Sequence, residues 1–216
     1  MPTTPNYGWT YPSSSGYVKN GASDMQTIAT GVDTTLGTAL NNKTRSGLVL
    51  ITSQTIGSGV STVSLNSVFS TNFKSYRIIY SPDASSLTGT VTYMRFRTGS
   101  TDNSTSNYSW AGNQVTYTNS ASTAANSSQN LGFIGYGSYT SPASWGTYVL
   151  DIFNPFLSQY TLWESAGTGV QSGGVLTRTT FGGYFNANTS FDGITFFPIA
   201  GTLTGGTIAV YGYAKD

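Results

Sequence analysis

The side chains of this sequence that could do acid–base chemistry are a few carboxylates in its longer, β-rich part. Asp151 stands out because it lies in the apolar stretch YVLDIF, where burial would raise its pKa and suit it to act as a general acid. Glycoside hydrolysis needs a second carboxylate on the other side of the bond that breaks. A commoner outcome is that such a strand aspartate pairs with an arginine, for example Arg178, or faces solvent. The candidate carboxylates are Asp83, Asp102, Asp151, Glu164 and Asp192.

Other catalytic and metal-binding chemistries lack their usual residues. The chain has no histidine and no cysteine, which removes the commonest general base, the commonest transition-metal ligand and every thiolate nucleophile. No GxSxG elbow, P-loop or GxGxxG sequence lies between a strand and a helix. A calcium site in the loop Ser100–Asn103 would have Asp102 as its one carboxylate, whereas such sites want several. We therefore expect a protein that is not an enzyme and uses no metal or cofactor.

Aromatic side chains offer the alternative of a binding surface. The sequence holds 15 tyrosines and 4 tryptophans, and rings flanked by Asn, Ser and Gly are typical of adaptable recognition loops. Rings stack on the C–H faces of sugars without needing charge, so a carbohydrate ligand fits this composition. The competing interpretation for each ring is burial in the core. The candidate ligand contacts are Trp110, Tyr139, Trp145 and Trp163.

Charge is scarce, and its scarcity excludes some partners. Only 8% of the residues are charged and the net charge is +1, with the basic residues scattered singly. Nucleic-acid binding needs a clustered basic face, so we expect none. No apolar run approaches the roughly 18 residues that span a bilayer, so we expect no membrane insertion. The surface is then polar through Ser, Thr, Asn and Gly, which suits a protein crowded in an assembly.

Residues 1–20 combine several prolines with several aromatic rings. They lack the basic and apolar regions of a secretory signal, so we expect the protein to stay in the compartment where it is made. Proline prevents a regular helix or ladder here, and disordered tails are depleted in aromatic residues. We therefore predict an extended peptide that docks on another surface. Its docking residues are Pro5, Tyr7, Trp9, Tyr11 and Pro12.

Residues 21–40 are the one stretch with a helical period. Apolar residues recur along it in steps of three and four. Gly31 and Gly37 each cost roughly 1 kcal/mol relative to alanine in a helix interior. The helix is therefore weak alone and needs a partner, which is a copy of itself, the downstream domain or another protein. The apolar stripe contains Met25, Ile28, Val32 and Leu36.

After a linker at 41–47, residues 48–216 have the character of a series of β-strands without a second helix. Thr90–Thr98 alternates most clearly and puts Arg95 and Arg97 on one face, either exposed or in a subunit contact. About ten or eleven such strands predict a mainly β fold. We expect an antiparallel, jelly-roll-like β-sandwich, preceded by the extended peptide and one short α-helix.

Composition predicts the breaks between these strands. Residues 98–107 and 118–130 are polar, low-complexity segments that we expect to be loops. The pair Gly182 and Gly183 indicates a bulge or a hairpin turn inside a longer β segment. Residues 191–197 and 206–213 are expected to form a closing hairpin.

Several stretches together resemble virion proteins of tailed bacteriophages, those described as tail, fibre or minor structural proteins. The opening PTTPNYGWTYP, followed by a short helix ending in VDTTLGTAL, resembles their N-terminal region. The remainder, from SGLVLI through FKSYRIIY and LDIFNP to GGTIAVYGYAKD, is similar to the β domain that often follows. The resemblance therefore covers most of the chain.

This resemblance implies a non-enzymatic, homotrimeric component of the virion, made in the host cytoplasm. Residues 1–20 would attach to other virion proteins, and the stripe at 21–40 would form a three-helix seam. The β domain at 48–216 would face outward and contact the host surface, in particular its glycans. Because the chain has no extended coiled coil or repeated shaft, the implied protein is a short tail fibre or fibre-like adhesin. A capsid decoration or cement protein that stabilises the head is the alternative.

Overall fold

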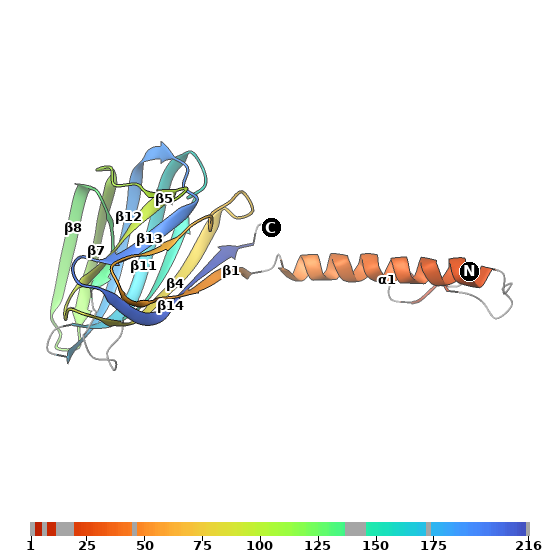
Figure 1. Cartoon of the computed structure of the whole chain (residues 1–216), viewed down its shortest axis with the longest axis horizontal. Coiled ribbons are helices and arrows are strands. Elements are labelled where there is room, and N and C mark those ends of the chain that lie inside the picture. Colours follow the sequence, from red (N-terminus) through yellow and green to blue (C-terminus); the bar gives the residue numbers. More distant parts are fainter. Residues whose placement is uncertain are drawn as a thin grey trace. The chain divides into compact units, whose positions relative to one another are not determined.

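The computed structural model describes residues 3–5, 8–11, 20–44, 47–136, 146–171 and 174–214. The chain divides into two compact units, one that ends at Gly47 and one that begins at Leu48. The first unit contains the helix α1, and the second contains the strands β1 to β14 (Figure 1). No helix among the described residues is both long and apolar enough to cross a bilayer.

Helix α1 spans Gly21–Thr44, so it continues past Leu40 into the segment expected as a linker. Its 24 residues correspond to a length of roughly 36 Å. Five threonine hydroxyls donate to the carbonyl oxygen four residues earlier, at 2.8–2.9 Å. These bonds satisfy the hydroxyls inside the helical geometry, so the threonines do not end the helix. The donors are Thr27, Thr30, Thr34, Thr35 and Thr38.

Nine strands form a large antiparallel sheet. Their order is β1, β14, β4, β10, β11, β12, β7 and β8, and the short β2 also pairs with β14. In Figure 1, β8 lies at one edge of this sheet. The bounds are β1 Leu48–Thr55, β2 Ser58–Val60, β4 Ser75–Ser85, β7 Tyr108–Thr116, β8 Ala121–Gln129, β10 Thr147–Phe153, β11 Gln159–Gln171, β12 Val175–Thr189 and β14 Leu203–Tyr213.

A smaller sheet of five strands packs on one face of the large sheet. Its order is β3, β13, β5 and β6, and β9 also pairs with β5. The predicted mainly β fold, an antiparallel β-sandwich with one helix, is therefore confirmed. The bounds are β3 Val63–Leu65, β5 Val91–Thr98, β6 Thr101–Asp102, β9 Gly132–Tyr136 and β13 Gly193–Pro198.

Aromatic rings fill the space between the two sheets. The ring of Phe96 in β5 stacks on Phe191 at a centroid distance of 5.0 Å and meets Trp163 of β11 edge-on at 6.0 Å. Trp163 is 1% exposed and lies opposite Gly183 of β12 in the strand register. A Cβ atom at Gly183 would lie 2.3 Å from Cζ2 of Trp163. Gly183 is therefore required by the packing of the indole ring.

The polar segment 118–130 is not the loop that its composition suggested. Ala121–Gln129 forms β8, which pairs with β7 and with no other described strand. Almost all of its side chains are exposed, so neither face is apolar and no alternation reveals the strand. Backbone hydrogen bonds to β7, rather than side-chain burial, hold this segment in the sheet.

Two predictions about the last third of the chain are wrong. The segments at 191–197 and 206–213 do not form a hairpin, because β13 pairs within the small sheet and β14 within the large one. Gly182 and Gly183 mark neither a turn nor a bulge, since the register of β12 continues through them on both sides. Gly183 therefore makes room for a core side chain, and neither glycine reverses the chain direction.

The two adjacent glycines of β12 predict opposite responses to the same substitution. Gly183→Ala should lower the free energy of unfolding by about 1–3 kcal/mol, because its methyl group overlaps the Trp163 ring and the Ser109 carbonyl oxygen. Gly182→Ala is the matched control and should leave stability within about 0.5 kcal/mol of wild type or raise it slightly. Urea unfolding monitored by circular dichroism measures both, and equal midpoints for the two variants would contradict this packing.

Candidate functional site

Asp151 of β10 lies on the outer face of the large sheet, the face turned away from the small sheet. Arg77 of β4 is its partner in the strand register. Nε of Arg77 donates to Oδ1 of Asp151 at 2.8 Å, and Nη2 donates to Oδ2 at 2.6 Å. The hydroxyl of Tyr213 donates to Oδ1 at 2.6 Å. Both carboxylate oxygens are therefore engaged, and the partner is Arg77 instead of the Arg178 that the sequence analysis suggested.

These contacts determine the protonation of Asp151. Burial alone would raise its pKa, but the hydrogen bonds from Arg77 and Tyr213, together with the Arg77 charge, outweigh burial and lower the pKa below its ordinary value. Burial, and then the bond to the carboxylate, raise the pKa of Tyr213. A general acid needs a raised pKa. Asp151 is therefore a structural carboxylate and is not suited to donate a proton near neutral pH.

A second arginine, Arg97 of β5, links three other strands of the small sheet. Arg97 is 7% exposed, although alternation places it on the face of Arg95. Its Nη1 donates to Oγ of Ser64 at 2.8 Å and to Oγ1 of Thr195 at 2.5 Å, and it also binds the carboxylate of Asp102. The expectation that both arginines are exposed or in a subunit contact is wrong for Arg97, because polar partners from three strands bury it.

The remaining candidate carboxylates do not gather into a metal site. Glu164 lies opposite Asp151 in the register and forms no ion pair among the described residues. Asp192 accepts hydrogen bonds from the Gly99 amide at 3.0 Å. Within the described ranges, no group of three or more potential ligand side chains comes together.

Two of the four predicted ligand contacts lie in the core. Trp163 packs inward from β11 and has no exposed ring face, which corrects the expectation that it contacts a ligand. Trp110 of β7 is 7% exposed and stacks on Phe133 at a centroid distance of 4.7 Å. Tyr139 and Trp145 lie outside the described residues.

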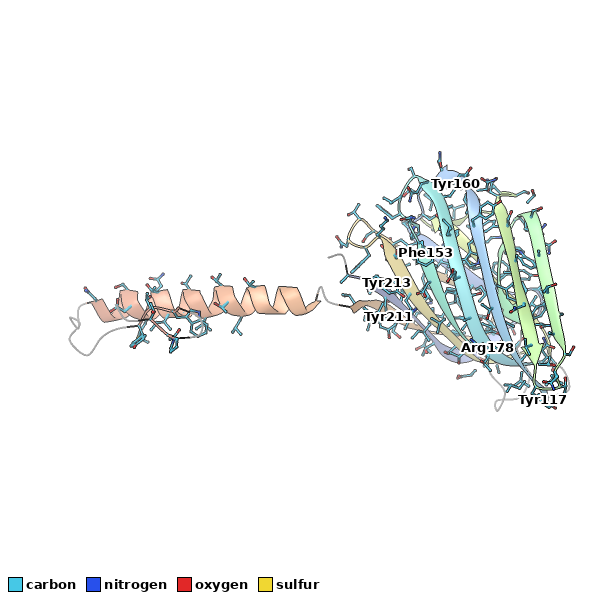
Figure 2. The ribbon with its side chains drawn as sticks, turned by 180° about the vertical axis from the view of Figure 1, so that it is seen from behind. Tyr117, Phe153, Tyr160, Arg178, Tyr211 and Tyr213 are labelled. Carbon is cyan, nitrogen blue, oxygen red and sulfur yellow. The ribbon has the colours of Figure 1, made fainter. Side chains whose placement is uncertain are left out.

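The large sheet exposes a different set of apolar side chains. Phe153, Leu162 and Tyr184 lie side by side across β10, β11 and β12, because the register pairs Leu162 with each of the other two. Tyr160 stacks on Tyr184 with a centroid distance of 6.4 Å and an angle of 17° between the rings. Figure 2 shows Phe153 and Tyr160 toward the same end of this sheet. We call these four residues the apolar row.

A hollow adjoins the apolar row on the outer face. Its volume is about 350 Å³, at the lower end of the roughly 300–1,000 Å³ typical of ligand pockets. It forms because the small residues Ser109, Ala111 and Gly182 of β7 and β12 lie beside the taller side chains of Leu162 and Tyr184. Such a site binds by shape, ring contact and a few uncharged hydrogen-bonding groups. Its lining consists of Ser109, Trp110, Ala111, Asn126, Leu162, Gly182, Gly183 and Tyr184.

Trp9 of the predicted docking peptide packs on α1. Its Nε1 donates to Oγ1 of Thr35 at 2.9 Å, and the Thr4 amide donates to the Trp9 carbonyl oxygen at 2.8 Å. A Cβ atom at Gly31 would lie 3.2 Å from Cδ1 of Trp9. The glycine that weakens the helix therefore makes room for the indole ring.

The other docking residues keep more of their surface. Pro5 is exposed, and the side chain of Tyr11 is 42% exposed. Tyr7 and Pro12 lie outside the described residues. Among the described docking residues, Trp9 is the one with a hydrogen bond to α1.

The apolar stripe of α1 is only partly covered. Ile28 and Val32 are half-buried, whereas Met25 is 70% exposed and Leu36 is 54% exposed. Exposed large apolar side chains on one face of a helix indicate a contact surface. The stripe therefore keeps unburied apolar area at both of its ends.

No family model, curated protein or solved structure matches this chain. The chain is an antiparallel β-sandwich protein, and the outer face of its large sheet carries exposed rings beside a hollow.

The Arg77–Asp151 pair predicts a pH dependence of stability. Because the pKa of Asp151 is lowered on folding, the pair stabilises the protein above the unfolded value of about 3.9 and loses this effect as pH falls through the lower folded value. Arg77→Met should reduce the free energy of unfolding at neutral pH, by a modest amount since the pair is partly exposed. Urea unfolding between about pH 7 and pH 2 should show the difference from wild type shrinking with acid; a constant difference would contradict it.

The packing of Trp9 on α1 predicts that leucine at two different helix glycines will affect the Trp9 ring differently. Gly31→Leu should displace the indole and remove its hydrogen bond to Thr35, although leucine favours the helix. Gly37→Leu is the matched control, because no atom lies within 4 Å of a Cβ at that position. Nitrogen-15 NMR should show a shifted, fast-exchanging Trp9 indole N–H in Gly31→Leu and an unchanged one in Gly37→Leu. An unchanged Trp9 signal in both variants would contradict the packing of the Trp9 ring against Gly31.

Proposed function

We propose that this chain is a non-enzymatic structural protein of a bacteriophage virion, a short trimeric tail fibre or fibre-like adhesin. The observation that carries the proposal is the outer face of the large sheet, where three side chains of the apolar row, Tyr160, Leu162 and Tyr184, are exposed beside the hollow. Exposed apolar patches of this kind are typical of binding surfaces. The sequence resemblance supplies the virion context.

The division into two units supports separate roles for assembly and recognition. The unit that ends at Gly47 contains the docking peptide and α1, and the unit from Leu48 contains the sandwich. In the proposed protein, the first unit attaches to other virion proteins and the second contacts the host surface, through glycans. This attachment uses no cofactor.

Self-association is proposed to run through α1. Met25 and Leu36 expose apolar area that two neighbouring copies of the helix would cover, with Ile28 and Val32 between them. Spacings of three and four residues suit a left-handed helical bundle. A helix with two interior glycines contributes modestly, so contacts between the sandwiches are proposed to hold most of the trimer.

The chemistry of Asp151 supports a binding role over a hydrolytic one. Both of its oxygens are occupied by Arg77 and Tyr213, and its pKa is lowered. Glycoside hydrolysis needs one carboxyl group that stays protonated, and the lowered pKa of Asp151 makes it unsuited to that part. The state of Asp151 therefore favours a surface that holds a sugar without cleaving it.

Deletion of residues 1–20 tests the assigned roles. The truncated protein should remain a soluble trimer in size-exclusion chromatography with light scattering, and it should still adhere to host cells. It should be missing from assembled particles, because the docking residues are removed. Incorporation at the wild-type level would overturn the docking role.

Two measurements distinguish the adhesin from the alternative of a capsid decoration protein: where the protein lies on the particle and whether it binds host cells. Immunogold labelling of particles should place the protein on the tail, and the purified trimer should bind host cells. Labelling spread over the head, together with no binding to cells, would favour a cement protein and overturn the adhesin proposal.

A further inference from the structure

We propose that the hollow beside the apolar row is a subsite for a neutral sugar ring, and that Gly182 keeps this subsite open. The inference rests on the proposed function, because it names the ligand class and the position of contact on the surface assigned to host attachment. It differs from the ring set expected from the sequence, since Trp163 lies in the core and takes no part.

Gly182 is not required by the packing of the protein. A Cβ atom there would meet nothing closer than 3.6 Å, the Trp163 carbonyl oxygen, which is an ordinary contact distance. Its φ angle lies outside the left-handed region that favours glycine. Glycine in a strand interior weakens the strand. The missing side chain at Gly182 therefore has its clearest consequence outside the fold, where it leaves the hollow empty.

The lining of the hollow matches the two kinds of surface that a sugar ring presents. The Tyr184 ring and Leu162 offer apolar contact to C–H groups, and the stacked Tyr160 extends this platform. Ser109 of β7, on the outer face, offers an uncharged hydroxyl that can donate to and accept from sugar hydroxyl groups.

Trp110 lines the hollow from β7, but its ring points into the core, where it stacks on Phe133 at a centroid distance of 4.7 Å. Its indole N–H therefore takes no part in the subsite.

Glu164 sets the charge that the subsite accepts. It lies opposite Gly182 in the strand register, and its Cγ is 4.0 Å from the place of a Gly182 Cβ. A carboxylate next to the hollow would accept hydrogen bonds from sugar hydroxyls and repel the carboxylate of an acidic sugar. The subsite therefore selects neutral hexoses and N-acetylhexosamines over uronic acids.

Binding of small probes to the full-length protein tests the subsite. The probes are methyl glycosides of neutral hexoses and N-acetylhexosamines, with methyl glucuronide as the acidic probe, measured by saturation-transfer NMR and titration. Wild type should bind at least one neutral probe. Gly182→Val should weaken that binding about tenfold or more, because its methyl groups fill the hollow. Thr180→Val, at the preceding outer position of β12, should bind like wild type.

Glu164→Gln tests the charge selection independently of the hollow's shape. The variant keeps a hydrogen-bonding side chain and removes the charge, so methyl glucuronide should bind at least about threefold more tightly than it binds wild type. Its affinity for the neutral probe should change less. Unchanged rejection of the acidic probe would overturn the role of Glu164.

The outcomes separate the subsite from the proposed function. If wild type adheres to host cells and Gly182→Val binds the neutral probe equally well, the subsite is overturned and the adhesin stands. If wild type adheres to cells but binds none of the neutral probes, the ligand class is overturned. If wild type binds a neutral probe through the hollow but does not adhere to cells, the adhesin proposal fails and the subsite remains.

Discussion

The contact between the Trp163 ring and Gly183 is the constraint on which the two faces of the large sheet depend. The indole occupies the space where a Gly183 side chain would stand, so β11 and β12 are held in one register. Because strand side chains alternate, a slip by one residue would expose Trp163 and bury Glu164. The outward positions of Leu162 and Gly182 follow from the same contact. The composition of the binding surface is thus a consequence of how the core packs.

Glycine residues and ion pairs elsewhere in the chain also determine the space and the charge around particular side chains. In α1, Gly31 leaves room for the Trp9 ring, and in β12, Gly182 leaves a space on the outer face that no side chain of the fold fills. Four of the nine basic and eight acidic residues are held in two ion pairs, Arg77–Asp151 and Arg97–Asp102. Around the hollow, the outer face presents apolar side chains and a hydroxyl group, with Glu164 as the adjoining charge. Recognition by such a face depends on stacking and shape more than on charge, and it should vary little with salt.

The fold class could be predicted from the sequence, but the site could not. The alternation of Thr90–Thr98 and the single helical period indicated a β-sandwich with one helix. Alternation alone did not reveal β8, whose two faces are both exposed, or the burial of Arg97, which depends on partners from distant strands. The hollow joins Ser109, Asn126 and Gly182 through strand pairing across many residues. Tryptophan content drew attention to Trp163, whereas the register exposes its neighbour Leu162.

Chemical-shift mapping of the isotope-labelled full-length protein with purified host-surface polysaccharide tests the central claim most directly, that the outer face of the large sheet is the recognition surface. The account predicts that the perturbed backbone amides cluster on β7, β8, β11 and β12, around Ser109, Asn126, Leu162 and Gly182. Amides of the small sheet and of α1 should stay unshifted. Perturbations confined to the small sheet or to the N-terminal unit would contradict the account.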